Sequence, residues 1–246
     1  MIISRNNALI KTVRALDRKK ERDETGLYIA EGLKTVKEAI ATGQEFFALI
    51  LTESGEKLLA GTELPEGVRA ELVSEEVFES CTGEVSPQGV LAVLYKPKKP
   101  ICASSGKSLF LDGVSDPANV GAIIRTAAAT GFTDIFIADG ADAYSQKAVR
   151  AAMSGIFRVN VFAGRREALV NLIESPFYAA DMGGKNPFKI NIPERFCLVI
   201  GNEAHGVSEF MKERSSETLG LPMKNGMESL NASVAAGVIM YALTNG

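Results

Sequence analysis

The sequence lacks any long apolar run. A membrane-spanning helix needs about 18 consecutive apolar residues, whereas the longest apolar stretch, Val234 to Leu243, is much shorter and predicts a buried helix. The N-terminal segment MIISRNNALIK contains no apolar core followed by a small-residue cleavage site, so no signal peptide is predicted. We therefore expect a cytoplasmic protein with no membrane partner.

Cysteine and histidine are also scarce. Cys81, Cys102 and Cys197 lie far apart and form neither a CxxC pair nor a zinc-ligand spacing. They are typical of reduced, buried thiols in a cytosolic protein, and no metal is predicted. His205 is the only histidine, and no nucleophile motif accompanies it. The absence of GxGxxG and GxxxxGKS/T loops makes dinucleotide and P-loop sites weak hypotheses.

The net charge of −3 does not indicate a nucleic-acid binder, but charge is unevenly distributed. Residues 1–22 carry seven basic and two acidic side chains, a local excess of five positive charges. The basic residues are Arg5, Lys11, Arg14, Arg18, Lys19, Lys20 and Arg22. Such a segment would attract a phosphate backbone, and a solvated helix face is an equally good interpretation.

Short apolar runs alternate with amphipathic segments in the first part of the chain, which predicts a small α/β domain. Strands are expected at 27–30, 46–51, 68–73 and 90–95, and helices at about 5–20, 32–41, 55–59 and from Ser74 onward. The stretch KPKKPICASSGKS that follows is typical of a linker. We expect domains at 1–96 and 107–246, joined by residues 97–106.

The second half predicts a mostly parallel sheet covered on both faces by helices. Strands are expected at 109–111, 134–138, 159–162, 177–180 and 197–200, and helices at 119–129, 144–153, 166–173 and 230–243. Ligands bind at the carboxyl ends of the strands in such sheets. Because every unusual loop of this half follows a strand, we expect these loops to lie together.

The first unusual loop leads into a helix within DGVSDPANVGAIIRTAAATGF, residues 112–132. Asn119 lies where the helix begins. Arg125 lies among apolar and small residues, where an arginine is costly unless its guanidinium has a partner. The alternatives are a functional group and a structural ion pair.

Two later loops contain further polar candidates. In VIGNEAHGVS, residues 199–208, Gly201 and Gly206 flank Glu203, whose carboxylate could hold an arginine or a substrate hydroxyl. In LGLPMKNGMESLNASVAAGVIMY, residues 219–241, Ser229 is predicted to begin the last helix with Asn231 in its first turn. These residues either cap the helix or contact RNA or a cofactor.

At these three loops the sequence resembles the SpoU/TrmH branch of the SPOUT methyltransferases. The matching segments are DPANVGAIIRTAAATGF, LVIGNEAHGVS and LPMKNGMESLNASVA, in the family's order and spacing. The resemblance covers about residues 107–246, with Ala204 where the family commonly has glycine. More weakly, YIAEGLKTVKEAI resembles the family's substrate-binding domain, an α/β module similar to ribosomal protein L30e.

The resemblance implies a fold and an activity. The fold is an L30e-like domain followed by a parallel-sheet α/β domain with a deep trefoil knot, in a homodimer formed through the C-terminal domain. The activity is methyl transfer from S-adenosylmethionine, which becomes S-adenosylhomocysteine, to a ribose 2′-hydroxyl of rRNA or, less favoured, tRNA. The implied catalytic residues are Asn119, Arg125, Glu203, Ser229 and Asn231. The implied cofactor-binding residues are Gly201, Leu221 and Leu230, with Ile200, Met223 and Ala180 as neighbours.

Arginine keeps its proton at neutral pH, so we do not expect Arg125 to act as a simple base. Our hypothesis is that it clamps an RNA phosphate and reaches a cofactor held by the other subunit, with Glu203 fixing the guanidinium. One rival is an RNA-binding protein whose methyltransferase-like domain is inactive. The other is an unrelated α/β enzyme acting on a small nucleotide, which the basic segment and linker disfavour.

Overall fold

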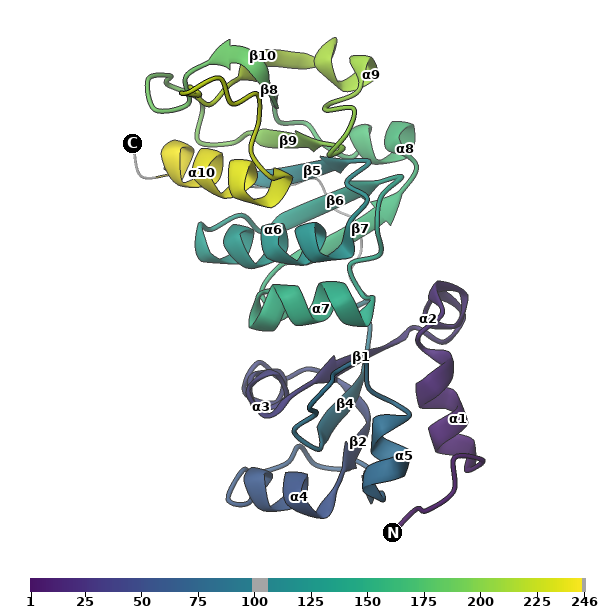
Figure 1. Ribbon diagram of the computed structural model, residues 1–246. Helices are drawn as coiled ribbons and strands as arrows, with labels where there is room; N and C mark the ends of the chain where they lie inside the picture. The colour runs from purple at the N-terminus through teal and green to yellow at the C-terminus, as the bar shows by residue number, and fades with distance from the viewer. Residues whose placement is uncertain (99–105, 245–246) are drawn as a thin grey trace. The chain divides into compact units, whose positions relative to one another are not determined.

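The computed structural model describes residues 1–98 and 106–244 (Figure 1). They form two compact units, one comprising Met1–Lys98 together with Tyr144–Phe157, the other comprising 106–143 and 158–244. Most of the predicted linker lies outside the described residues. The predicted domains are continuous in sequence, whereas the first unit also includes a segment from the second half of the chain.

The first unit contains a four-stranded sheet of order β1-β4-β2-β3. β4 is antiparallel to β1 and β2, and β3 is parallel to β2. The strands are β1 (Leu27–Glu31), β2 (Phe46–Leu51), β3 (Ala70–Leu72) and β4 (Val90–Tyr95). The helices from the N-terminal part are α1 (Ala8–Ala15), α2 (Lys19–Thr25), α3 (Leu33–Ala41), α4 (Glu53–Leu59) and α5 (Glu75–Glu79). The mixed sheet with helices confirms the predicted α/β architecture.

The remaining helix of this unit is α7 (Gln146–Ala152), followed by the 3₁₀ turn η1 (Met153–Phe157). Side chains alternate across β1, so Ile29 joins the core with α1 and α5 while Tyr28 faces the other way and packs on Tyr144, with ring centroids 4.9 Å apart. Arg150 of α7 also forms an ion pair with Glu84. The sequence predicted a helix here but not its place beside β1.

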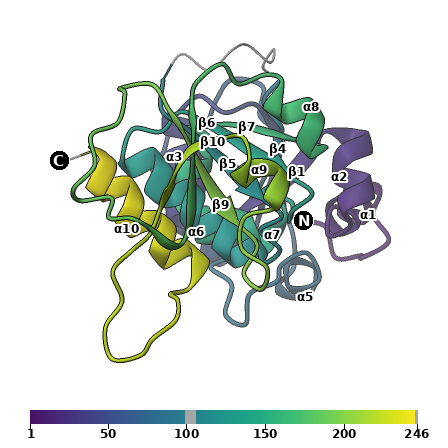
Figure 2. The ribbon, with the colours of Figure 1, turned by 90° about the horizontal axis from the view of Figure 1, so that it is seen from above.

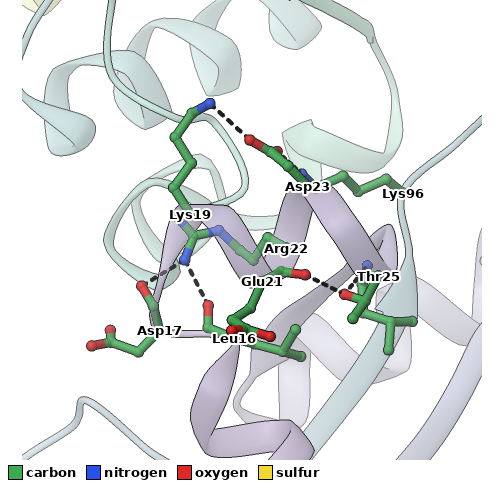
Figure 3. A network of polar contacts seen from close by, with 9 residues as sticks. Leu16, Asp17, Lys19, Glu21, Arg22, Asp23, Thr25 and Lys96 are labelled. Carbon is green, nitrogen blue, oxygen red and sulfur yellow. Dashed lines mark hydrogen bonds and ion pairs between the residues drawn. The ribbon is translucent and has the colours of Figure 1, made fainter.

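The predicted helix at 5–20 is instead two helices, because Arg22 stabilises the end of the first. Its guanidinium donates hydrogen bonds to the carbonyl oxygens of Leu16, at 2.6 Å, and Asp17, at 2.7 Å (Figure 3). Carbonyls at a helix end need such partners, and a cation there is favourable. Arg22 is only 4% exposed, so this basic residue is not available to a phosphate backbone.

Several other cations of the segment 1–22 are paired with acids. Lys19 pairs with Asp23 at 2.9 Å, Arg18 with Glu21 at 2.9 Å, and Lys20 with Glu24 at 3.7 Å. Asp23 and Glu24 lie just beyond the counted segment, and Lys96 adds a second cation at Asp23 (Figure 3). For residues 18–24 the structure therefore favours the solvated-helix interpretation over a phosphate site.

The second unit contains a six-stranded sheet of order β10-β8-β9-β5-β6-β7, in which every neighbouring pair is parallel. This confirms the predicted parallel sheet. The strands are β5 (Ser108–Asp112), β6 (Asp134–Ala138), β7 (Asn160–Gly164), β8 (Phe177–Lys185), β9 (Cys197–Gly201) and β10 (Ser215–Leu219). β5 and β6 are buried at every residue, as continuous apolar runs predict.

The helices of this unit are α6 (Pro117–Ala129), α8 (Arg166–Val170), α9 (Glu209–Lys212) and α10 (Ala232–Thr244). α10 packs beside α6 (Figures 1 and 2). α9 and β10 were not predicted, because SSETL contains a single strongly apolar residue and EFMK is one short turn. The described residues contain no helix long and apolar enough to cross a membrane. Cys81 and Cys197 are buried and free, whereas Cys102 lies outside the described residues.

Candidate active site

The three unusual loops meet in the second unit, as the strand-end rule predicted. The loop after β5 reaches Asp116, the N-cap of α6. The loop after β9 is anchored to it, because Asn202 donates from Nδ2 to the carbonyl oxygen of Gly113 at 2.8 Å. The chain before α10 joins them through Asn231, whose Nδ2 donates to Oδ1 of Asn119 at 3.0 Å. Loops far apart in sequence thus form one site at the carboxyl ends of parallel strands.

Glu203 fastens the β9 loop to the start of α6. Its carboxylate accepts hydrogen bonds from Nδ2 of Asn119 at 2.8 Å, the backbone N–H of Ser115 at 3.1 Å and that of Asp116 at 3.2 Å. The Ser115 hydroxyl donates a further bond at 2.9 Å. Backbone N–H groups before a helix are natural partners for a carboxylate. Glu203 therefore holds the loop between β5 and α6 in its conformation.

Asn119 links this carboxylate to the last helix. A carboxylate only accepts hydrogen bonds, so the Asn119 amide must direct its N–H toward Glu203 and its oxygen toward Asn231. Oδ1 of Asn231 is then left to accept from the backbone N–H of Ser233, at 2.9 Å, as an N-cap does. Asn231 therefore caps α10, which begins later than predicted, and also contacts Asn119. The capping interpretation of Asn231 is confirmed, and its contact with RNA or a cofactor stays a prediction.

Arg125 does not join this group. It lies six residues after Asn119 on the same helix, and at 3.6 residues per turn the two side chains point about 120° apart. Asn119 is buried whereas Arg125 is exposed, not enclosed among apolar residues. Among the described residues no carboxylate pairs with Arg125, and the partners of Glu203 are those given above. The hypothesis that Glu203 fixes the Arg125 guanidinium is therefore not supported within one chain, nor is a structural ion pair.

A cavity of about 810 Å³ lies beside Glu203 and Asn231. All six predicted cofactor-binding residues line it: Ala180, Ile200, Gly201, Leu221, Met223 and Leu230. Of the predicted catalytic residues, Glu203, Ser229 and Asn231 line it, and Asn119 lies behind Glu203 and Asn231. Ser229 is exposed and makes no hydrogen bond with the described residues. The structure thus places these residues at one cavity. Their catalytic and cofactor-binding roles stay predictions.

Close contacts between backbone segments shape this cavity. A Cβ atom on Gly201 would lie 2.1 Å from the carbonyl carbon of Gly206, which itself has a φ of +69°. A Cβ on Gly220 would lie 2.6 Å from the backbone nitrogen of Gly184. Only glycine permits such approaches. The sequence analysis did not single out Gly184 and Gly220, although a glycine pair, 183–184, follows the apolar run 177–180 after two residues and was a usable signal.

Asp112 is a further residue that the sequence analysis did not single out. Its carboxyl group is buried at the end of β5, pairs with Arg166 and accepts a hydrogen bond from the backbone N–H of Ser208 at 2.8 Å. A buried carboxylate requires such partners. Asp112 thereby holds the far end of the β9 loop, and an acid directly after a buried apolar strand was the signal available in the sequence.

The hydrogen bonds at Glu203 affect its ionisation. Burial alone would raise the pKa of Glu203, but the bonds from Asn119 and from the backbone at Ser115 and Asp116 lower this pKa from 4.5 to about 2. A lowered pKa means that the ionised carboxylate stabilises the fold above about pH 4.5 and that this contribution is lost as the pH falls toward 2. Glu203 is exposed, so the contribution is small.

We therefore expect Glu203→Gln to be less stable than the wild type at pH 7 and the difference to shrink as the pH falls from 4.5 toward 2. Urea unfolding at several pH values measures it. Glu228→Gln is the control, since Glu228 is exposed and makes no hydrogen bond with the described residues. A difference for Glu203→Gln that is constant with pH would contradict the assignment.

No group of three or more potential metal-ligating side chains occurs within residues 1–98 and 106–244. His205 lines the cavity, and its backbone N–H donates to Oδ1 of Asn202 at 3.1 Å. The polar side chains here are amides, three carboxylates, the His205 imidazole and the Ser229 hydroxyl. Such a set can position a ligand and hold a hydroxyl group, but it contains no activated nucleophile.

Residues 107–241 match the model of the SpoU rRNA Methylase family. The chain belongs to this family. Residues 7–92 match the model of the MRM3-like substrate binding domain. These assignments confirm the resemblance drawn from the three loops of the second half and the weaker one in the first.

Individual SpoU relatives match along almost the whole chain. The 23S rRNA (guanosine(2553)-2′-O)-methyltransferase RlmP of Bacillus subtilis is 32% identical over 248 residues, covering 98% of both chains. The 23S rRNA (guanosine-2′-O-)-methyltransferase RlmB of Xylella fastidiosa (strain 9a5c) is 30% identical, covering 85% of this chain and 93% of its own. The crystal structure of an AdoMet-bound rRNA methyltransferase from Sinorhizobium meliloti superposes with a TM-score of 0.86 at 28% identity, covering 98% of this chain and 95% of the other.

Proposed function

We propose that the protein transfers a methyl group from S-adenosylmethionine to a ribose 2′-hydroxyl of ribosomal RNA. The observation that carries the proposal is the hydrogen-bonded chain Glu203–Asn119–Asn231 at the edge of the 810 Å³ cavity. It joins the three segments that define the family. The curated relatives are named as 23S rRNA 2′-O-methyltransferases, which favours rRNA over tRNA and a place in the cytoplasm.

The cavity fits the proposed methyl donor. Its volume lies in the range of small-molecule sites, and its walls combine the apolar side chains of Ile200, Leu221 and Leu230 with the glycines Gly201 and Gly220. Apolar walls suit an adenine ring. The donor supplies an electrophilic methyl group on a cationic sulfur. The protein has to place a hydroxyl in line with that methyl.

The residues around the cavity divide this task. Ser229 has a free hydroxyl at the cavity and can hold the acceptor ribose, while Asn231 is fixed by Asn119 and α10. Arg125 is exposed and keeps its proton at neutral pH, so it suits an RNA phosphate. Residues 1–96 are proposed to bind the RNA around the target nucleotide, with 107–246 as the methyltransferase domain.

We further propose that the protein works as a homodimer through its second unit. Arg125 does not contact Glu203 in its own chain. In the proposed dimer it would lie at the cavity of the partner subunit. Next to it, an open apolar groove of about 670 Å³ runs along α6 and α10 and includes Thr126, Val234 and Tyr241. Val234, Tyr241 and the neighbouring Phe188 are each at least half exposed, and an apolar patch of this kind marks a contact surface.

A trefoil knot is part of the same proposal, as the family resemblance implies. Two observations support it. β10 lies at the edge of the sheet beyond β8 and β9, and α10 then returns across the sheet to pack on α6. A chain that crosses its own earlier strands is compatible with a knot, which also requires that its end pass through a loop of the earlier chain.

Tyr241→Glu is expected to give a monomer with little methyltransferase activity, because a carboxylate would be desolvated in the contact. Analytical ultracentrifugation and transfer of labelled methyl groups to rRNA measure the two effects. Leu58→Glu, which alters an exposed apolar residue of α4 in the first unit, is the control and should stay dimeric. A monomeric wild type with full activity would contradict the proposal.

The function itself is tested by mapping ribose methylation in rRNA and tRNA from cells with and without the protein. The expected result is one rRNA 2′-O-methyl group that is lost without the protein and restored by purified protein and S-adenosylmethionine. Binding of the donor without transfer to any RNA would instead favour the inactive RNA-binding protein.

A further inference from the structure

The charged side chains that line the 810 Å³ cavity are all acidic. They are Asp181, Glu203 and Glu228, and no lysine or arginine of the described residues belongs to the lining. These three carboxylates differ in how they are held. Glu203 is committed to the bonds with Ser115, Asp116 and Asn119, and Glu228 lies on an exposed stretch before α10.

Asp181 is a fixed carboxylate in the wall of this cavity. It lies in β8 directly after Ala180, and its side chain is 22% exposed. Its Oδ1 accepts a hydrogen bond from the backbone N–H of Met182 at 2.8 Å, and its Oδ2 pairs with Lys212 Nζ at 2.6 Å. Each carboxylate oxygen has a second lone pair, so the group can still face a ligand.

The donor and the product of the proposed reaction differ by one positive charge. When the methyl carbon forms its bond to the ribose oxygen, the carbon–sulfur bond breaks and its electron pair stays on sulfur, while the hydroxyl proton passes to solvent. A sulfonium becomes a neutral thioether. The ammonium and carboxylate of the methionine part cancel in both molecules, so the net charge falls from +1 to zero.

We propose that Asp181 makes the cavity discriminate between the cationic methyl donor and its neutral product. This inference rests on the proposed function. Because Asp181 lines the cavity and Lys212 does not, a ligand in the cavity faces the negative end of this ion pair. That end attracts the sulfonium more than the thioether, so it favours exchange of product for fresh donor. Lys212 holds the carboxylate in place without lining the cavity itself.

The test is calorimetric binding of three ligands to the full chain: S-adenosylmethionine, S-adenosylhomocysteine and sinefungin, in which a carbon bearing an amino group replaces the methylated sulfur. In Asp181→Asn we expect the affinity for the two cationic ligands to fall by about fivefold, the effect of one partly screened charge. The affinity for S-adenosylhomocysteine should change by less than about twofold. Glu209→Gln is the matched control, because Glu209 also pairs with Lys212, at 3.3 Å, but does not line the cavity.

Two results would overturn the inference: equal weakening of all three ligands by Asp181→Asn, or the same ligand pattern in Glu209→Gln. Asp181→Glu keeps the charge and should keep the preference, which provides a second test if the asparagine variant is unstable. A wild type that binds none of the ligands would instead refute the proposed function. A wild type that binds all of them, with an unchanged preference in Asp181→Asn, would refute only the role of Asp181.

Discussion

Arg125→Lys is expected to lose about 100-fold in methyl transfer to RNA while binding S-adenosylmethionine as well as the wild type does. Lysine keeps the positive charge but lacks the planar fork that binds a phosphate through two parallel hydrogen bonds. A misplaced acceptor group alone can cost about this factor. Arg125 lies outside the cavity lining and has no ion-pair partner in the described chain, so donor binding and stability should not change.

Single-turnover transfer to rRNA measures the first effect, and calorimetry with the donor measures the second. Arg165→Lys is the matched control, since Arg165 is exposed in the same unit, just before α8, and should retain full activity. Full activity of Arg125→Lys would contradict the phosphate clamp. Loss of donor binding would place Arg125 at the donor instead of the RNA.

Gly201→Ala is expected to abolish donor binding and to lower the free energy of unfolding by about 2 kcal/mol, in the range for overpacked sites. The added methyl would lie 2.1 Å from the carbonyl carbon of Gly206 and 2.2 Å from the backbone nitrogen of Val207. Backbone cannot yield as a flexible side chain does. The whole turn from Asn202 to Gly206 would have to move, together with Glu203.

Urea unfolding and calorimetry with the donor test this variant. Gly164→Ala, at the end of β7, is the matched control, because its methyl would meet only side-chain carbons of Leu169 at 3.6 Å. That variant should bind the donor normally. A Gly201→Ala protein with wild-type affinity would show that the turn is not part of the donor site.

The parallel sheet and the meeting of its loops could be predicted, because both follow from local pattern. The runs 109–111 and 135–138 are apolar throughout, as strands buried on both faces are. Parallel strands place the loops that follow them at one edge. That rule alone predicts that the loops carrying Asn119, Glu203 and Asn231 lie together.

Other features depend on tertiary contacts that no local pattern contains. The partner of Glu203 is an example: a carboxylate accepts from any nearby donor, and Asn119 with two backbone N–H groups satisfies it instead of Arg125. The position of α7 is another example, because a helical pattern in the sequence does not indicate which sheet the helix packs against. The direction of Arg125 could have been predicted, since six residues along a helix never return to the same face.

The hydrogen bonds from Glu203 to the start of α10 have a direction. Each amide donates toward the carboxylate and accepts from the next group, so Asn119 and Asn231 are oriented in series and polarise one another. The backbone N–H of Ser233, in the first turn of α10, is thus linked to the ionised carboxylate through a series of hydrogen bonds. Protonation of Glu203, or replacement of either amide by an acid, would reverse or interrupt this alignment. The change would alter the hydrogen bonds that cap α10, the helix that borders the apolar groove.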